Sequence, residues 1–125
     1  MTKQIITTDK APKSPAYSQA VKAAGLIFVS GQGPFDPLTG DVVGSTIQEH
    51  TRQCLKNVQA ILEASGSSME KVVSVTFILA EPEDFAGLNE EWIKWFPKDP
   101  PARQGAKLPI QAKGMKVSIA VIAEA

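Results

Sequence analysis

The segment KVVSVTFILA, from Lys71 to Ala80, decides the fold, because almost all of its residues are apolar or β-branched. A run of this length and composition predicts a β-strand that is buried on both faces. The segments LIFVS (Leu26–Ser30) and VSIAVIA (Val117–Ala123) have the same character. We therefore expect a β-sheet whose main strands must be shielded from water on both sides.

Two amphipathic helices are predicted, one before and one after this strand. The first has a capping-box pair, Thr46 and Glu49, at its start and Gly66 at its end. Its apolar residues recur at helical spacing at Ile47, Cys54, Leu55, Val58, Ile61 and Leu62. The second helix is predicted to start at Pro82 and to end before Pro97. Its apolar stripe consists of Phe85, Leu88, Trp92 and Trp95 with Phe96.

Further strands are expected at Lys3–Thr7 and at Gln19–Ala23, which a hinge at Ala24–Gly25 joins to Leu26–Ser30. The elements fit one domain, residues 1–125, of the α+β class, with two helices on one face of a sheet of four to six strands. Since the main strands are apolar on both faces, the second face needs a partner. A symmetric oligomer that packs sheet against sheet provides one. A monomer with a small apolar patch is the alternative.

The balance of charges argues against a nucleic-acid partner. Lysine and arginine together number 13, as do aspartate and glutamate, so no general positive field attracts a phosphate backbone. The single cysteine, Cys54, excludes an internal disulfide and favours a reducing compartment. The first residues lack the apolar run of a signal peptide, and no segment approaches the roughly 20 apolar residues of a membrane-spanning helix. We expect a cytoplasmic protein without membrane contact.

Neither a metal nor an organic cofactor is indicated. The only histidine, His50, lies four residues before Cys54, and two ligands do not make a zinc site. A catalytic triad would have to use His50, which no nucleophile motif surrounds. The GQG of Gly31–Gly33 is followed at once by Pro34, and the common glycine-rich nucleotide motifs are missing from the sequence. Most carboxylates fall at turns or on polar helix faces, where water solvates them.

Four polar residues at strand ends, in loops or on the second helix are candidates for a binding site: Tyr17, Ser30, Asn89 and Arg103. Arg103 follows two prolines among small residues, in a segment that resembles the start of a strand, and the prolines restrict its backbone. A planar guanidinium holds a carboxylate through two parallel hydrogen bonds. Structural roles are the alternative: a packing aromatic, a strand-end residue, a buried amide and a solvated arginine, respectively.

Four stretches together resemble the RidA/YjgF family, also called the L-PSP endoribonuclease family. They are FVSGQGPFDPLTG (Phe28–Gly40), QCLKNVQAILEASG (Gln53–Gly66), DFAGLNEEW (Asp84–Trp92) and PPARQG (Pro100–Gly105). The resemblance extends from about Ala11 to Ala123. It implies a fold like that of Bacillus chorismate mutase, a mixed sheet with two helices on one face. It also implies a homotrimer with ligand sites between the subunits.

The resemblance further implies an activity, the hydrolysis of 2-iminopropanoate and 2-iminobutanoate to 2-keto acids and ammonia without a cofactor. When the family's roles are carried over residue by residue, the catalytic residues are Arg103, Tyr17 and Ser118. Arg103 would bind the carboxylate of a small substrate. The substrate-binding residues would be Ser30, Gly31 through its backbone N–H, Asn89 and Gly105, together with Arg103.

This chain departs from the family pattern at several positions. Ser118 stands where characterised deaminases have a glutamate, and a hydroxyl can hold a water molecule but cannot accept its proton at neutral pH. Gly105 replaces a frequent cysteine, and Pro15–Ala16 replace the usual glycine-proline before Tyr17. Pro109 predicts a bulge or a sheet edge after Arg103.

These departures leave three classes of function open. The first is an imine deaminase, and the second is a trimeric protein that binds 2-keto acids or similar small carboxylates without turnover. The third is a ribonuclease, which the second family name implies. For that activity the sequence has no histidine pair, no basic stripe and no stacking platform.

Overall fold

The computed structural model of the protein describes residues 2–107 and 114–125. Within these ranges the chain forms a six-stranded sheet, two α-helices and two short 3₁₀ helices. The strands are β1 (Gln4–Ile6), β2 (Ala20–Ala23), β3 (Leu26–Gln32), β4 (Val72–Leu79), β5 (Ala102–Lys107) and β6 (Val117–Glu124). The helices are α1 (Ile47–Ala64) and α2 (Phe85–Trp95), and the 3₁₀ helices are η1 (Met69–Lys71) and η2 (Pro82–Asp84). The α+β class is confirmed.

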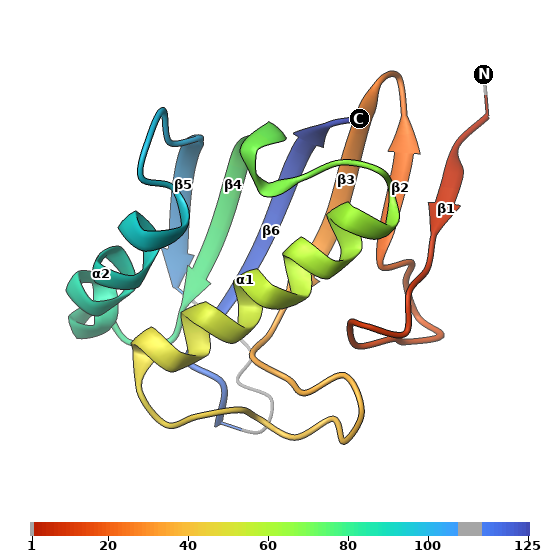
Figure 1. Ribbon diagram of the computed structural model, residues 1–125. Coiled ribbons are helices and arrows are strands. Elements are labelled where there is room, and N and C mark those ends of the chain that lie inside the picture. The colour runs from red at the N-terminus through yellow and green to blue at the C-terminus, as the bar shows by residue number, and fades with distance from the viewer. Residues whose placement is uncertain (1, 108–113) are drawn as a thin grey trace.

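The strands of the sheet lie in the order β1-β2-β3-β6-β4-β5. All neighbours are antiparallel except β4 and β5, which run parallel. The sheet is therefore mixed, as the family resemblance implied. A parallel pair needs a crossover connection, and α2 lies in that connection. Figure 1 shows α2 beside β5 at one edge of the sheet and β1 at the other edge.

Helix α1 begins and ends as the sequence predicts. The Thr46 hydroxyl accepts a hydrogen bond of 3.1 Å from the Glu49 N–H. The Glu49 carboxylate in turn accepts one of 3.0 Å from the Thr46 N–H. Gly66, just past the helix, has a φ of 85°, which a residue with a side chain adopts only with strain. Helix α2 begins three residues later than predicted, because η2 forms the first turn after Glu81.

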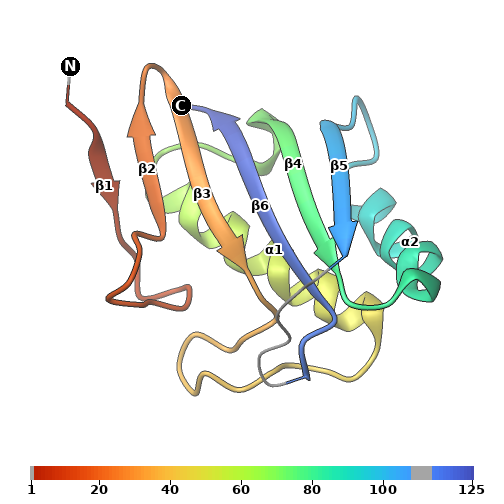
Figure 2. The same cartoon turned by 180° about the vertical axis from the view of Figure 1, so that it is seen from behind.

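Both helices pack on one face of the sheet, as Figures 1 and 2 show from opposite sides. On β6 the buried residues are Val117, Ile119, Val121 and Ala123, and the more accessible ones between them are Ser118, Ala120 and Ile122. Phe28 pairs with Ile122 and is 42% exposed on this second face. No helix among the described residues covers it, in agreement with the prediction that two helices cover only one face. We call this second face the open face.

Arg103 is the second residue of β5, which begins directly after the Pro100–Pro101 pair. The segment therefore is a strand, and β5 is the last strand at its edge of the sheet. Pro109, with its predicted bulge, lies outside the described residues. In the described ranges, no helix has the length and apolar content needed to cross a bilayer.

Candidate functional site

The Arg103 side chain is held by α2, the helix that connects β4 to β5. Its Nη1 donates a hydrogen bond of 2.8 Å to Oδ1 of Asn89. Asn89 lies on α2 one residue after the fully buried Leu88, so the packing of α2 against the sheet fixes where the amide points. Two of the residues predicted for the site, Arg103 and Asn89, are thus in direct contact.

Three aromatic rings surround the Arg103 guanidinium. Its Cζ atom lies 4.9 Å from the ring centroid of Phe77, 5.0 Å from that of Trp92 and 5.5 Å from that of Phe85. A cation within about 6 Å of a ring face is attracted by the ring quadrupole. Burial lowers the pKa of Arg103, although a guanidinium stays protonated at neutral pH. The rings therefore hold a charged group that is partly withdrawn from water.

Arg103 has no carboxylate partner within residues 2–107 and 114–125. Its only described side-chain hydrogen bond goes to a neutral amide. The other arginine of the chain, Arg52, differs in this respect, because it donates two hydrogen bonds to the Glu91 carboxylate. A partly desolvated cation that lacks a counter-charge is favourably placed to bind an anion.

A cavity of about 520 Å³ opens beside the guanidinium. Its lining combines apolar side chains with the polar residues of β5. The lining residues are Phe77, Leu79, Pro82, Phe85, Arg103, Gln104, Gly105, Ala106 and Lys107. The volume lies in the range of small-molecule binding sites, which are mostly apolar with a few polar groups that orient the ligand.

Residue 105, another predicted site residue, must be a glycine because the Phe77 ring occupies the space that a side chain would need. The two residues are register partners on β4 and β5. A Cβ atom on residue 105 would lie 2.2 Å from Cζ of Phe77, which is far inside van der Waals contact. The absence of a side chain at residue 105 therefore allows the Phe77 ring to lie across β5 beside Arg103.

The remaining predicted residues form a second group around β3 and β6. The Ser30 hydroxyl donates a hydrogen bond of 2.6 Å to the carbonyl of Ser18, which is next to Tyr17. A Cβ atom on Gly31 would lie 3.0 Å from Oγ of Ser118, so these two residues also adjoin. Tyr17 is 51% exposed, which disagrees with its alternative role as a packing aromatic.

One chain does not bring the two groups together. Arg103 and Gly105 lie on β5, and their neighbour Phe77 is buried on the helix side of the sheet. Ser118 is on β6 and belongs to the open face, while Tyr17 precedes β2 near the far edge. Strand β4 separates β5 from β6. The seven predicted residues therefore fall into two groups on different parts of the molecule.

Comparisons with known proteins place the chain in a family. The model of the family Endoribonuclease L-PSP matches residues 8–125. The chain belongs to this family. RidA from the Antarctic bacterium Psychrobacter sp. PAMC 21119 has a similar structure, with a TM-score of 0.91 and 36% identity over 98% of this chain and 99% of that one.

Two curated relatives of this L-PSP family protein carry the names of deaminases. Reactive Intermediate Deaminase A of Arabidopsis thaliana, a chloroplastic protein, is 44% identical over 115 residues, which are 89% of this chain and 62% of the plant protein. The 2-iminobutanoate/2-iminopropanoate deaminase of Rattus norvegicus is 38% identical over 122 residues, which are 97% of this chain and 89% of the rat protein. The resemblance that the sequence motifs indicate is thus confirmed.

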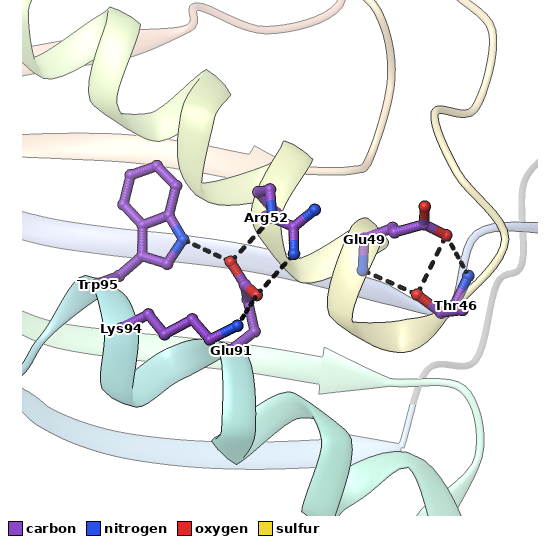
Figure 3. A network of polar contacts seen from close by, with 6 residues as sticks. All are labelled: Thr46, Glu49, Arg52, Glu91, Lys94 and Trp95. Carbon is purple, nitrogen blue, oxygen red and sulfur yellow. Dashed lines mark hydrogen bonds and ion pairs between the residues drawn. The ribbon is translucent and has the colours of Figure 1, made fainter.

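Glu91 in this L-PSP family protein departs from the expectation that carboxylates are solvated. It is buried between α1 and α2, where its carboxylate accepts hydrogen bonds from Arg52 Nε (3.1 Å), Arg52 Nη2 (3.0 Å) and Trp95 Nε1 (3.0 Å). Lys94 Nζ lies 3.8 Å from Oε1 of Glu91 and completes the network shown in Figure 3. Burial opposes the ionisation of Glu91, but the hydrogen bonds from Arg52 and Trp95 outweigh it and lower its pKa. The network fixes α2, and with it Asn89, to α1.

His50 and Cys54 have structural positions in the family protein. His50 Nδ1 accepts a hydrogen bond from the Lys116 N–H at 3.2 Å, so Nε2 carries the proton and donates to the Gly44 carbonyl at 3.0 Å. Cys54 is fully buried, and burial raises the pKa of its thiol. Among the described residues, no group of three or more histidine, cysteine or acidic side chains could hold a metal ion.

Proposed function

We propose that this protein hydrolyses small 2-imino acids, such as 2-iminopropanoate and 2-iminobutanoate, to 2-keto acids and ammonia. The observation that carries the proposal is Arg103, a partly buried cation that pairs with an amide and with no described carboxylate. In the reaction, water adds to the C=N carbon of the iminium. The C–N bond then breaks, and a 2-keto acid and an ammonium ion leave, so that atoms and charges balance.

Arg103 supplies the anchor for this chemistry. Two parallel charge-assisted hydrogen bonds from the guanidinium to the substrate carboxylate fix the neighbouring C=N carbon in place. The contact is strengthened because the guanidinium is partly shielded from water by Phe77, Phe85 and Trp92. Asn89 keeps the guanidinium from rotating.

The second group of predicted residues, around β3 and β6, supplies the side chains that position the attacking water. The Ser118 hydroxyl can hold the water, while the Gly31 N–H and the Tyr17 hydroxyl can contact the substrate. A free iminium is already electrophilic, so attack does not require a strong base. Because these residues lie away from Arg103 in one chain, we propose a symmetric homotrimer in which they approach Arg103 of a neighbouring subunit. The open face, where Phe28 is exposed, is the surface that such an assembly would cover.

A competition assay tests the activity. An amino-acid oxidase generates 2-iminopropanoate in the presence of semicarbazide, which traps the imine. Active protein should reduce semicarbazone formation in proportion to its concentration, and Arg103→Lys should lose most of this effect, since an ammonium group cannot reproduce the paired hydrogen bonds. Semicarbazone formation that stays unchanged at every protein concentration would refute the proposal.

Subunit complementation tests the shared site. Arg103→Ala and Ser118→Val chains are each expected to be impaired when purified alone. When they are co-expressed and purified as mixed trimers, about a quarter of the sites should combine an intact Arg103 with an intact Ser118. Recovered activity supports sites between subunits. If sedimentation shows isolated chains, or if the mixture is no more active than its components, the trimeric site is wrong.

A second candidate function is a binding protein without turnover, and Ser118 is the observation that favours it. A hydroxyl cannot take the proton of the attacking water at neutral pH. Calorimetry with 2-oxobutanoate separates the two candidates. Binding that Arg103→Ala abolishes, together with no measurable imine hydrolysis, would favour the binding protein.

A further inference from the structure

In one chain, the cavity beside Arg103 is larger and more apolar than a three- or four-carbon acid requires. We propose that the site prefers 2-imino acids with larger apolar side chains, such as isobutyl or benzyl groups, over those with methyl or ethyl side chains. This inference rests on the proposed function and specifies its substrate class. The proposed function concerns the carboxylate and the reacting carbon, whereas this inference concerns the side chain.

The direction of β5 determines where a bound side chain would lie. All residues of β5 from Arg103 to Lys107 line the cavity. At about 3.3 Å per residue, the cavity wall continues for about 13 Å from Arg103 to Lys107. A methyl group on an acid anchored at Arg103 would reach only the first part of this length. The remainder is available to a longer side chain.

The middle of this wall, at Gly105, is backed by the ring of Phe77. The Phe77 ring occupies the place where a side chain on residue 105 would otherwise stand, 2.2 Å from the ideal Cβ position. Phe77 is 6% exposed, so its ring closes the inner side of the wall at this point. Gly105, in register with it, leaves the middle of the wall without a side chain of its own. A branched or planar ligand side chain has room beside Gly105 and buries more apolar area there than a methyl group does.

Phe85 forms the second aromatic wall. Its ring lies 5.9 Å from that of Phe77 at an interplanar angle of 29°. It lines the cavity, yet 44% of the residue remains exposed. Leu79 and Pro82 complete the apolar part of the lining. A ligand side chain in the cavity would cover the exposed part of Phe85 and gain the corresponding hydrophobic free energy.

Lys107 adds a restriction on charge. It lies at the end of the wall opposite Arg103, so a cationic side chain anchored by its carboxylate would point toward a like charge. Among the described residues, the lining includes two cations and no acidic side chain. Imino acids derived from basic amino acids should therefore be poor ligands.

The first measurement uses 2-keto acids, which are stable and keep the carboxylate of the imines. Calorimetry on the whole protein would compare pyruvate, 2-oxobutanoate, 4-methyl-2-oxopentanoate and phenylpyruvate. The last two should bind at least about tenfold more tightly than pyruvate. The semicarbazide assay with imines made from alanine, leucine and phenylalanine should give the same order in kcat/KM.

Single substitutions identify the lining residue that causes the preference for large side chains. Phe85→Ala should reduce the ratio of phenylpyruvate affinity to pyruvate affinity at least about fivefold. Ile93→Ala is the matched control, because Ile93 is an apolar residue of the same helix, is 65% exposed and does not line the cavity. It should leave the ratio unchanged.

The outcomes separate this inference from the proposed function. If pyruvate binds as tightly as phenylpyruvate, or if Phe85→Ala and Ile93→Ala change the ratio equally, the side-chain preference is wrong, whatever the catalytic activity. If large keto acids bind more tightly but no imine is hydrolysed, the preference holds and the deaminase function fails. If no keto acid binds and no imine is hydrolysed, both are wrong.

Discussion

Asn89 on α2 accepts a hydrogen bond of 2.8 Å from Arg103 on β5, and this contact gives the guanidinium a fixed direction without neutralising its charge. An amide can orient the guanidinium in this way because its oxygen accepts a hydrogen bond while the group carries no net charge. A carboxylate in the same place would compete with any anionic ligand.

Asn89→Asp tests this relationship directly. The new carboxylate should form an ion pair with Arg103, so the melting temperature should stay the same or rise while 2-keto acid affinity falls by about tenfold or more. Glu90→Gln, a charge change at the exposed neighbouring residue, is the control. Thermal unfolding and calorimetry on the same samples provide the comparison. An Asn89→Asp protein that binds keto acids as well as the unmodified protein would contradict the role of Arg103.

Arg103→Lys should reduce kcat/KM for imine hydrolysis by about 100-fold while the protein stays folded. Lysine keeps the charge but loses the planar pair of donors, so the substrate is no longer oriented for attack. The imine competition assay measures the loss, and circular dichroism checks the fold. Equal activity in the two proteins would mean that only the charge matters.

Gly105→Ala should destabilise the protein by about 1–3 kcal/mol, because its Cβ would overlap the Phe77 ring. Phe77→Leu removes the obstructing ring atoms and leaves a small cavity of its own. The double variant should therefore be more stable than the sum of the single effects indicates. Urea unfolding of the four proteins in the cycle measures this coupling. Additive effects would show that Phe77 yields to the methyl group without strain.

Arg52→Met should destabilise the protein more than Glu91→Gln does. The Glu91 side chain is 3% exposed and that of Arg52 is 43% exposed. Removal of Arg52 leaves a buried carboxylate with fewer donors, whereas Arg52 without its partner can regain water. We expect about 1–3 kcal/mol for Arg52→Met, since partial exposure reduces the effect of a fully buried pair. Chemical denaturation of both variants at pH 7 is the measurement.

Acid should weaken the start of α1 through Glu49. Hydrogen bonds from the Ser45 and Thr46 N–H groups and the Thr46 hydroxyl lower the Glu49 pKa from 4.5 to about 2. Because the folded-state pKa is the lower one, the stabilisation is complete above pH 4.5 and is lost as the pH falls toward 2. Glu49→Gln should therefore show a flatter decline in unfolding free energy between these pH values. Parallel declines for both proteins would argue against the capping box as the cause.

The sheet and both helices follow from the sequence because their signals are local. Strand alternation around Ser118 and the Thr46–Glu49 capping pair each occupy a few consecutive residues. The environment of Arg103 depends instead on contacts between distant segments. The PPARQG motif indicates a charged group that binds an anion. The Phe77 ring, however, contacts the Arg103 guanidinium only because β4 and β5 pair in this register. The Phe85 and Trp92 stripe was predicted as a packing surface, and the same side chains also enclose the guanidinium.

The ion pair of Glu91 also depends on a contact between segments that are distant in the sequence. Its position three residues after Leu88 and four before Trp95 places it beside the apolar stripe of α2, which is a usable signal of burial. Its partner Arg52 is 39 residues away, on another helix. Only the packing of α2 on α1 brings the two charges together, so sequence spacing alone did not identify the pair.

Arg103 and the side chains that contact its guanidinium are encoded in one continuous piece of chain. Asn89, Arg103 and the three rings all fall between Val72 and Lys107, in the β4–α2–β5 unit. Such a unit is a natural module for segment exchange between related proteins. A chimaera that receives this module from a relative should inherit the donor's choice of ligand, while the residues around β3 and β6 stay those of the recipient.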